Sequence, residues 1–271
     1  MKKIKIVILG GGNLGASLAK GLINSKQFVL DEILVTDKRK SRVDYLKNLG
    51  FIASSNNRDA VKHSDIIFMS VKPQQFNELC GEIKDCLKKG QLIISTITGI
   101  SFKEMETVFG KIPLIRIMPN MALEICESMT CIAFKNCTPK HEKKILSIFE
   151  NMGKTLVIPE DLMSAATVIG ACGIAFALRF MRAMSQGGIE IGFNSEISHL
   201  ITAQTVKGAA SLIIETSNHP EGEIDKVTTP QGITISGLNE MEHQGLSSAV
   251  IRGLTTSFNK LENMLSKTRK Y

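Results

Sequence analysis

The sequence contains no tryptophan, and aromatic residues make up only 5% of its 271 positions. Lysine and arginine (33) outnumber aspartate and glutamate (26), which gives a net charge of +7, but the basic residues are scattered along the chain. A nucleic-acid surface usually concentrates its basic residues and often adds aromatic side chains on which bases stack. We therefore expect no nucleic-acid partner, although a phosphate-bearing cofactor would suit the excess positive charge.

Metal-binding cysteine patterns and long apolar segments are missing as well. The six cysteines form no C-x-x-C pair and the five histidines do not cluster with them, so we expect no metal site. The apolar segment after Met1-Lys2-Lys3 stops at Gly10, which is too early for a secretory signal. No apolar run approaches the roughly 18–20 residues that a membrane helix needs. These absences predict a cytoplasmic protein with reduced thiols and no membrane partner.

Short apolar segments alternate with helical segments over the first 160 residues. The strands predicted from this pattern are residues 3–9, 33–36, 65–71, 91–95, 113–118, 128–134 and 155–158. Helices are predicted at 13–25, 57–63, 101–109 and 138–152, and another follows Lys72-Pro73 and ends near Lys88. Such alternation is typical of the α/β class, and it predicts a doubly wound, Rossmann-type parallel sheet with helices on both faces.

The predicted strands stop near Pro159. Residues 161–268 have a helical pattern, with breaks predicted at 170–173, 187–188, 217–223 and 229–232. We therefore predict two domains: a dinucleotide-binding domain over residues 1–160 and an all-α domain over residues 161–271. An all-α domain of this kind covers a ligand or pairs with another subunit, and the pattern alone does not choose between the two.

A glycine-rich motif follows the first predicted strand. Gly10-Gly11-Gly12-Asn13-Leu14-Gly15 fits the pattern G-x-G-x-x-G and leads directly into a helix, which is typical of a dinucleotide-binding loop. Gly10 would permit a tight turn, Gly12 a close approach of the pyrophosphate, and Gly15 close packing of helix on strand. The helix N-terminus at Asn13 and Leu14 would bind the phosphates. The alternative is a glycine-rich turn without a ligand.

Charged residues follow the second predicted strand. Asp37 stands at about the distance from the glycines that is expected of a carboxylate binding the ribose 2′-hydroxyl of NAD. Lys38, Arg39 and Arg42 follow it, and such cations suit the 2′-phosphate of NADP. The residues therefore leave NADP(H) and NAD(H) both open, with a solvated basic turn as the alternative.

Two further strand ends carry candidate ligand-binding residues. Ligands of open parallel sheets bind beyond the carboxyl ends of the strands. Lys72, in Val71-Lys72-Pro73, is therefore a candidate neighbour of the cofactor, and Asn120 is a candidate for binding the nicotinamide amide or the substrate. The alternatives are a solvent-exposed lysine and an ordinary turn residue.

The helical half contains one candidate anion site. Thr229-Pro230 predicts a helix start, with Thr229 as the N-cap and Pro230 at the first helical position. The N–H groups of residues 231–233 and the hydroxyls of Thr229 and Thr234 would then suit a substrate carboxylate. A plain helix start is the alternative.

With these motifs the chain resembles the pyrroline-5-carboxylate reductases, which catalyse the last step of proline synthesis. The resemblance runs along nearly the whole chain, through ILGGGNLGASLAKGL, NNRDAVKHSDIIFMSVKPQ, ISTITGIS, RIMPN, AQTVKGAASLIIETSNHP and DKVTTPQGITISGL. The last string is typical of this family and far more specific than the glycine motif. The resemblance implies a small-molecule substrate, an NADP(H) cofactor with NAD(H) as an alternative, and a homo-oligomer whose building block is a dimer.

The resemblance also implies a reaction and roles for single residues. A hydride from the nicotinamide reduces the C=N bond of 1-pyrroline-5-carboxylate to give L-proline. The imine can arrive protonated, so positioning and electrostatics matter more than a strong general acid. By resemblance, the cofactor is bound by Gly10–Gly15, Thr36, Asp37, Lys38, Arg39, Asn57, Val71, Lys72 and Pro73. The substrate carboxylate is bound by Thr229, Gly232, Ile233 and Thr234, with Thr234 as the catalytic hydroxyl donor.

The chain departs from the family pattern at several positions. The family commonly has Gly where this chain has Gln231, Thr where it has Ile233, Pro where it has Ile174, and Thr-Pro where it has Met121-Ala122. These changes keep two alternatives open: a reductase of a related imine, or a non-catalytic nucleotide-binding descendant. A hydroxyacid dehydrogenase of the same two-domain plan is disfavoured, because no lysine occurs between Lys154 and Lys207 to act as its acid.

Overall fold

The chain forms two compact units. The computed structural model describes residues 4–268, so the Met1-Lys2-Lys3 start lies outside the described part. One unit consists of Met1–Cys172 together with Lys260–Tyr271, and the other of Gly173–Asn259. This division follows compactness, whereas the boundary expected at 160 follows the change from strands to helices. The functional domains 1–160 and 161–271 stay a prediction.

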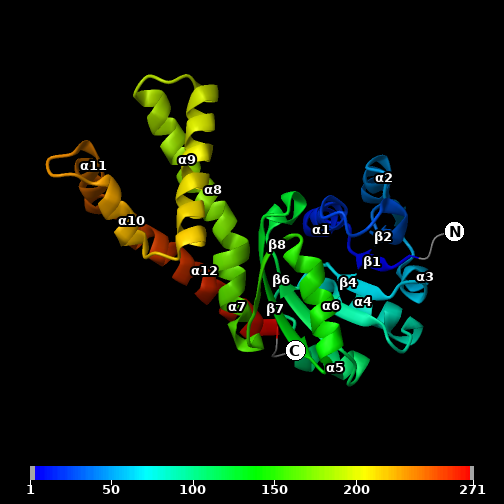
Figure 1. The fold of residues 1–271 in the computed structure, drawn as a ribbon. Coiled ribbons are helices and arrows are strands. Elements are labelled where there is room, and N and C mark those ends of the chain that lie inside the picture. The colour runs from blue at the N-terminus through cyan, green and yellow to red at the C-terminus, as the bar shows by residue number, and fades with distance from the viewer. Residues whose placement is uncertain (1–3, 269–271) are drawn as a thin grey trace. The chain divides into compact units, whose positions relative to one another are not determined.

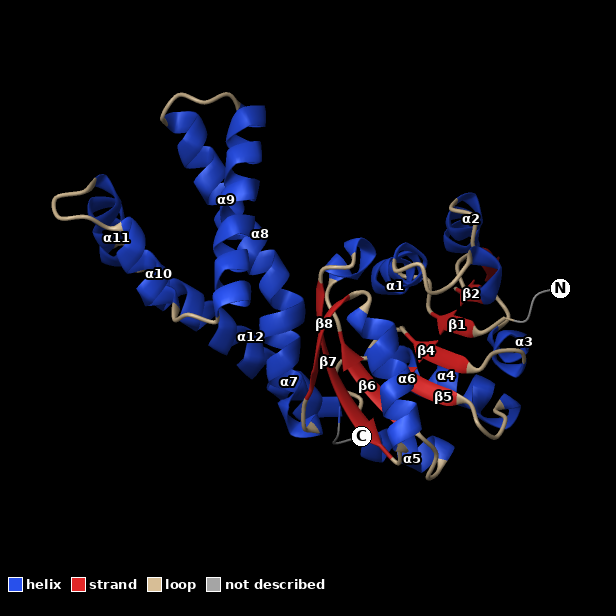
Figure 2. Ribbon diagram, viewed as in Figure 1, coloured by secondary structure: helices blue, strands red, loops and turns tan. Residues whose placement is uncertain are grey.

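The first unit is built on one sheet, which has eight strands within the described residues and the order β3-β2-β1-β4-β5-β6-β7-β8 (Figures 1 and 2). The strands are β1 (Ile6–Leu9), β2 (Ile33–Thr36), β3 (Ile52–Ser54), β4 (Ile66–Met69), β5 (Leu92–Ser95), β6 (Leu114–Met118), β7 (Ser128–Lys135) and β8 (Gly153–Val157). Strands β1 and β4 are buried along their full length. Burial on both faces is why their sequences are continuous apolar runs instead of alternating patterns.

Helices cover both faces of this sheet, as the sequence predicts. One face packs against α1 (Asn13–Asn24), α2 (Lys40–Asn48) and α6 (Pro139–Glu150), and the other against α3 (Asn57–Lys62), α4 (Phe76–Ile83), α5 (Phe102–Phe109) and α7 (Met163–Ala166). Successive residues of β1 enter different cores: Ile6 and Ile8 pack with Phe149 of α6, and Val7 and Leu9 pack with Leu79 of α4. The sheet therefore separates two apolar cores.

The sheet differs from the prediction in two respects. Strands β6 and β7 run antiparallel, whereas every other neighbouring pair is parallel. Between them residues 119–127 hold only a short 3₁₀ turn, which cannot carry the chain back to the opposite end of the sheet as a parallel crossover requires. The sequence analysis also omits α2 and β3, because only Val43 and Leu46 of α2 are buried and β3 is short.

The second unit is helical within the described residues. It contains α8 (Gly173–Glu190), α9 (Ser195–Thr216), α10 (Pro220–Val227), α11 (Ile233–His243) and the first part of α12 (Leu246–Thr268). The breaks expected at 170–173 and 187–188 are wrong. A π-helical turn, Thr167–Cys172, leads straight into α8, and Gly187-Gly188 lies inside α8. A Cβ on Gly188 would overlap the hydroxyl of Ser198 on α9, so this glycine allows two helices to pack closely instead of ending one.

A helical stretch from Glu160 to Glu190 corrects the expectation that no apolar segment approaches membrane length. It spans 31 residues, has a mean hydropathy of 1.7 over its most apolar window, and only 17% of that window is buried. By length and composition alone it could cross a membrane. This stretch is hard to recognise in the sequence, because glycine and small polar residues interrupt its apolar side chains between Leu162 and Leu178. No charged residue occurs between these two leucines.

The last part of α12, from Lys260 onward, belongs to the first unit, whereas the part up to Asn259 belongs to the second. Gly99, in the loop that follows β5, has a positive φ of 83°, and a Cβ there would overlap the side chain of Leu265. The loop after β5 and the C-terminal part of the chain are therefore in contact within one unit.

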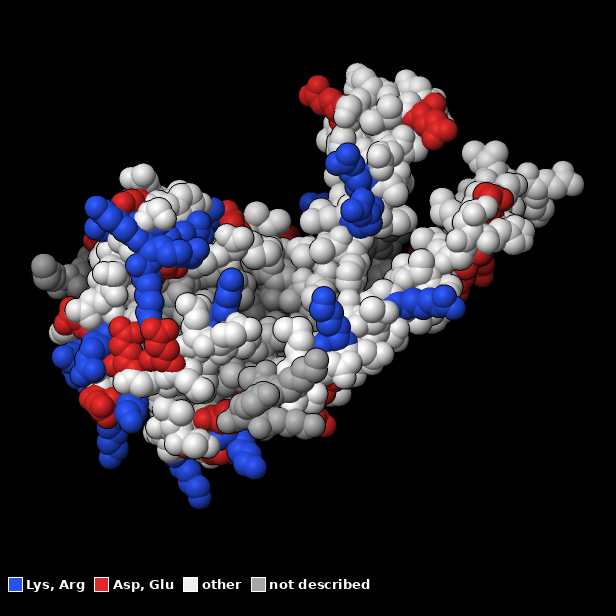
Figure 3. Space-filling model, turned by 180° about the vertical axis from the view of Figure 1, so that it is seen from behind, with Lys and Arg blue, Asp and Glu red and all other residues white. Residues whose placement is uncertain are grey.

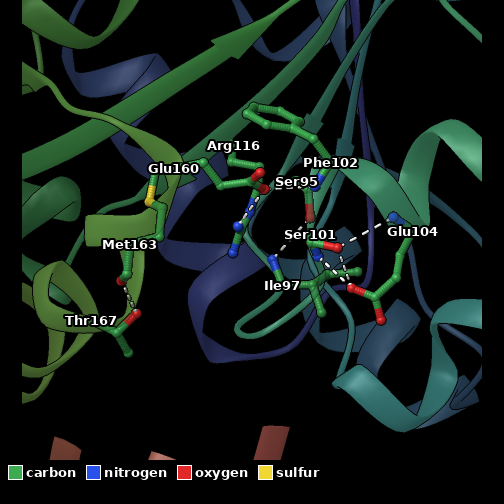
Figure 4. Close-up of polar contacts among 9 residues, drawn as sticks. All are labelled: Ser95, Ile97, Ser101, Phe102, Glu104, Arg116, Glu160, Met163 and Thr167. Carbon is green, nitrogen blue, oxygen red and sulfur yellow. Dashed lines mark hydrogen bonds and ion pairs between the residues drawn. The ribbon is translucent and has the colours of Figure 1, made fainter. Parts of the chain in front are cut away.

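A polar cluster lies beyond the carboxyl ends of β5 and β6 (Figure 4). Arg116 of β6 is buried, and its Nη1 donates to Oε1 of Glu160 at 2.7 Å. The same carboxylate oxygen accepts from the backbone N–H of Phe102 at 2.6 Å, at the start of α5. Ser101 and Glu104 complete a capping box at that helix start. Glu160 thus connects the sheet, α5 and the beginning of the long helical stretch.

We expect Glu160→Gln to lower the free energy of unfolding by about 1–3 kcal/mol, because it leaves the buried Arg116 without its counter-charge. The expected loss of stability is smaller than for a fully buried ion pair, because the Glu160 side chain is 33% exposed. Urea unfolding at fixed protein concentration measures the change. Glu78→Gln breaks the ion pair with Lys38, in which the Glu78 side chain is 65% exposed, and is the control, since solvated surface pairs contribute little to stability. Equal free energies of unfolding for the two variants would contradict the role given to Glu160.

Candidate functional site

In the turn between β1 and α1, Gly10 and Gly15 have a steric reason to be glycine, whereas Gly12 does not. Gly10 has a φ of +106°, and a Cβ there would overlap the carbonyl oxygen of Ser70. A Cβ on Gly15 would overlap the carbonyl oxygen of Gly10, so α1 approaches β1 as closely as backbone allows. A Cβ on Gly12, by contrast, would meet nothing within 4 Å. Gly12 therefore faces open space at the N-terminus of α1, where a phosphate would fit.

A pocket of about 300 Å³ lies at the carboxyl ends of β1, β2 and β4. Strand β1 stands between β2 and β4, so the pocket is at the point where the strand order reverses, which is where open α/β sheets bind their ligands. Among the predicted cofactor residues, those lining it are Gly10, Gly12, Thr36, Asp37, Lys38, Arg39, Asn57, Val71 and Lys72. The lining also includes four residues that the sequence analysis missed: Ser70, Gln75, Glu78 and Leu79. The remaining predicted residues, Asn13, Leu14, Gly15, Pro73 and Asn120, are not part of the lining.

Two basic side chains of the pocket are paired with acidic ones. Arg39 meets Asp37 with two side-chain N–H groups, Nε to Oδ1 and Nη2 to Oδ2, both at 2.9 Å. Lys38 forms a single ion pair with Glu78. Figure 3 shows basic and acidic side chains intermingled on one face of the molecule. The pocket therefore has no unbalanced row of like charges.

These pairings change the acidity of the groups involved. Partial burial raises the pKa of the Asp37 carboxyl, but the hydrogen bonds from the side chain and backbone of Arg39 outweigh it, so its pKa falls below the usual value. The hydrogen bond to Glu78 raises the pKa of Lys38. Both residues consequently stay charged at neutral pH.

A buried hydrogen-bond chain fixes the middle of the pocket. The hydroxyl of Thr36 donates to Oδ1 of Asn57 at 2.6 Å, and Nδ2 of Asn57 donates to Glu82 at 2.8 Å. Thr36 is fully buried and Asn57 is 6% exposed. The Asn57 side chain is thus held in one orientation at the start of α3.

Arg42, which lies in α2, is hydrogen-bonded to the glycine turn. Its guanidinium donates to the carbonyl oxygens of Gly11 and Gly12, the latter at 3.0 Å, and its Cζ lies 4.5 Å from the centre of the Tyr45 ring. The side chain that the sequence analysis listed as a 2′-phosphate candidate is therefore occupied with the backbone of the turn.

Asn120 has local partners. Its Nδ2 donates to the carbonyl oxygen of Gly170 in the π-helical turn at 3.2 Å, and its Oδ1 accepts from the backbone N–H of Ala122 at 3.0 Å. These bonds tie the end of β6 to the π-helical turn. A role in cofactor binding stays a prediction.

The segment before α11 is a turn, and the expected helix start at Thr229-Pro230 is wrong. The N–H of Gly232 donates to the carbonyl oxygen of Thr229 at 2.8 Å, which closes a β-turn with Pro230 and Gln231 at its centre. Proline favours the second position of such a turn, and Gln231 in the third has a φ of +58°, which a right-handed helix does not allow. Helix α11 begins at Ile233, with Gly232 as its N-cap.

This correction moves the candidate anion site by a few residues. The N–H of Gly232 is used by the turn, so the unpaired N–H groups of the helix start at Ile233 and not at 231. The side chain of Ile233 is 92% exposed, and Thr229 and Thr234 are exposed as well. The candidate hydroxyls and N–H groups of this segment are all open to solvent in the single chain.

The helical unit exposes many large apolar side chains. They include Leu178, Phe180, Ile191, Phe193, Leu200, Ile214, Val250 and Ile251. Figure 3 shows that much of the surface of these helices is uncharged. Exposed apolar area of this extent marks an interaction surface, because monomeric soluble proteins rarely leave it open to water.

The described residues 4–268 contain no group of three or more His, Cys, Asp or Glu side chains able to hold a metal ion. The six cysteines are free. Burial raises the pKa of the Cys80 thiol to about 12, so this thiol stays protonated and unreactive.

Family models match both parts of the chain. Residues 160–264 match the model described as pyrroline-5-carboxylate reductase dimerisation. Residues 5–99 match the model described as NADP oxidoreductase, coenzyme F420-dependent.

Relatives match along nearly the whole chain. Pyrroline-5-carboxylate reductase 1 of Dictyostelium discoideum is 41% identical over 98% of this chain, which spans only 50% of that relative's length. Pyrroline-5-carboxylate reductase 2 of the same organism is 39% identical over 94% of this chain and 91% of the relative. The crystal structure of Plasmodium falciparum pyrroline carboxylate reductase with NADP bound has a TM-score of 0.88 and 26% identity, covering 97% of this chain and 99% of that one.

We expect Gly12→Val to abolish dinucleotide binding, because its side chain would fill the open space at the N-terminus of α1. Titration with NADP⁺, followed by calorimetry, measures the loss, and circular dichroism checks that the fold is kept. Gly81→Val is the matched control, since a Cβ at Gly81 of α4 also meets nothing within 4 Å and Gly81 does not line the pocket. Retained affinity in the Gly12 variant would remove the glycine turn from the binding site.

Proposed function

This chain belongs to the pyrroline-5-carboxylate reductase family, and we infer from this premise that it reduces the C=N bond of 1-pyrroline-5-carboxylate to L-proline with NADP(H). The observation that carries the inference is the 39% identity to a reductase of this name along 94% of the chain. The glycine turn and the pocket beside it supply the nucleotide site that such an enzyme needs. The enzyme is an oxidoreductase acting on a carbon–nitrogen double bond.

We propose that the pocket at the carboxyl ends of β1, β2 and β4 holds the cofactor. The open space beside Gly12 fits a pyrophosphate, and the N–H groups at the start of α1, from Asn13 and Leu14 onward, face it with the positive end of the helix dipole. Residues 36–39 and Asn57 bind the adenosine end, and Val71, Lys72 and Pro73 extend the groove. When bound, the cofactor supplies the hydride that the imine carbon receives.

We propose that the segment around α11 binds the carboxylate of the substrate. The unpaired N–H groups from Ile233 onward and the hydroxyl of Thr234 are donors of the kind a carboxylate needs. Thr229 and Gly232 shape the turn that precedes them. The Ile233 side chain is almost fully exposed in the single chain, so its backbone and not its side chain contributes to this site. Asn120 supports the cofactor from the end of β6.

Chemistry in this site needs orientation more than proton transfer. The cyclic imine can arrive protonated, so no residue has to donate a proton to nitrogen at the moment of hydride transfer. Fixed donors at the substrate carboxylate and a fixed cofactor bring the two reacting carbons together. The described residues offer a hydroxyl, backbone N–H groups and charged side chains, which are groups able to bind the substrate carboxylate and the cofactor.

We also propose that the protein works as a homodimer in the cytoplasm. The match to a dimerisation model covers residues 160–264, the part that exposes most of the large apolar side chains. A second copy that covers this surface also accounts for the apolar stretch Glu160–Glu190 without a membrane. Six free cysteines suit a reducing compartment.

Oxidation of NADPH by the purified protein with 1-pyrroline-5-carboxylate tests the proposed function directly. We expect turnover on the order of 1–1000 per second. A reductase of a related imine is the second candidate, favoured by Gln231 and Ile233 beside the proposed carboxylate site. Absence of turnover with 1-pyrroline-5-carboxylate, with NADP⁺ binding intact, would reject the first function. Screening of other cyclic imino acids would then separate the second candidate from a non-catalytic protein.

We expect Thr234→Ala to raise the KM for the imine or lower kcat by an amount equal to about 1–3 kcal/mol, the usual value of a hydrogen bond to a charged group. The dissociation constant for NADP⁺ should stay unchanged, and Thr234→Ser should restore most of the activity. Thr255→Ala removes a hydroxyl that bonds only to its own helix backbone and serves as the control. Unchanged kinetics in the Thr234 variant would exclude this hydroxyl from the site.

Gln231 occupies a backbone position that usually favours glycine, since its φ is +58°. We expect Gln231→Gly to raise the free energy of unfolding by about 0.5–1 kcal/mol, because the left-handed conformation strains any residue with a Cβ. Thr228→Gly, at a φ of −103°, should have the opposite effect. Urea unfolding compares the two variants, and a loss of stability in both would show that Gln231 makes favourable contacts that offset the strain.

A further inference from the structure

Asp37 stands where a dinucleotide-binding sheet usually presents a carboxylate to the ribose 2′-hydroxyl. For that task the carboxylate accepts a hydrogen bond from the hydroxyl. In this chain Oδ1 accepts both the backbone N–H of Arg39 at 3.0 Å and its Nε at 2.9 Å, and Oδ2 accepts Nη2 at 2.9 Å. A single residue therefore uses three of the roughly four hydrogen bonds that this carboxylate can accept.

The two partners differ sharply in exposure. The Asp37 side chain is 9% exposed, whereas the Arg39 side chain is 65% exposed. The carboxylate is thus the buried member of the pair, and the guanidinium is the exposed member. Both residues line the pocket. A guanidinium has more N–H donors than one carboxylate can accept, so the outer edge of Arg39 keeps donors for another anion.

We propose that Asp37 is a positioning residue that holds Arg39, and that the outer edge of Arg39 binds the 2′-phosphate of NADPH. The inference rests on the cofactor site proposed above and assigns to Asp37 the reverse of its usual role. An acidic residue at this position ordinarily repels a 2′-phosphate. Here its charge is neutralised by the bidentate pair, and its geometry fixes the plane of the guanidinium.

Two of the other cations that follow β2 have other partners. Lys38 pairs with Glu78 across the pocket, and Arg42 donates to the carbonyl oxygens of Gly11 and Gly12. Lys72 also lines the pocket, but it follows β4, which lies on the other side of β1 from β2. Planar, paired donors of an arginine match the oxygens of a phosphate better than the single ammonium of a lysine does. Arg39 is therefore the side chain best prepared for a phosphomonoester beside the adenosine end.

A double-mutant cycle on equilibrium binding tests the proposal without using the reaction. Dissociation constants for NADP⁺ and NAD⁺ are measured by calorimetry for the wild-type protein, Asp37→Asn, Arg39→Ala and the double variant. We expect Arg39→Ala to weaken NADP⁺ binding by about 10- to 100-fold, the value of a charge-assisted hydrogen bond, with NAD⁺ changed by less than about threefold. Asp37→Asn should also weaken NADP⁺ selectively, and the double variant should bind like Arg39→Ala alone.

Two further measurements separate the proposal from general damage to the pocket. Adenosine 2′,5′-bisphosphate and 5′-AMP differ only in the 2′-phosphate, so Asp37→Asn should weaken only the former. Glu124→Gln makes the same change of carboxylate to amide in an ion pair with Lys20 outside the pocket lining, and should alter neither nucleotide.

Tighter NADP⁺ binding in Asp37→Asn, or weaker NAD⁺ binding with NADP⁺ unaffected, would overturn the proposal and make Asp37 an ordinary ribose ligand. Equal weakening of both nucleotides would overturn it too, as would additive effects in the double variant. Failure of the proposed function is distinguishable, since it would appear as absent turnover with the selective binding pattern intact.

Discussion

Close contact between the start of helix α1 and the end of strand β1 is the constraint on which the nucleotide site depends. The helix can approach only because Gly15 has no side chain to meet the carbonyl oxygen of Gly10. That approach aims the N-terminus of α1 at the space beside Gly12, and Arg42 holds the intervening carbonyl groups in place. Apolar packing on both faces of the sheet keeps strand and helix from separating, so the two cores stabilise the geometry of the site.

Features encoded in short stretches were predictable from the sequence. The β1 run, the glycine motif and α1 lie within one continuous segment, and so do the buried strand β4 and the residues that follow it. Ser70, Gln75, Glu78 and Leu79 line the same pocket but carry no signal of their own, because the fold brings them there. Glycine was misleading in the helical unit: Gly188 serves packing against Ser198 and does not end the helix.

Backbone conformation and pairing explain the remaining differences. The sequence TTPQG suggested a helix start, but the bond from Gly232 to Thr229 closes a turn first, which delays the helix to Ile233. Likewise, an acidic residue after β2 suggests a ribose ligand, but here Arg39, two positions later, forms a bidentate pair with it. Both cases depend on a local hydrogen bond that residue type alone does not reveal.

The first unit is discontinuous, since it combines Met1–Cys172 with Lys260–Tyr271 while the residues between form the second unit. During synthesis on the ribosome the sheet and both cores are complete long before the segment from Lys260 has left the exit tunnel. Until then the loop at Gly99 lacks its contact with Leu265. The nascent nucleotide-binding unit therefore acquires its final packing only after the helical unit that interrupts it has emerged.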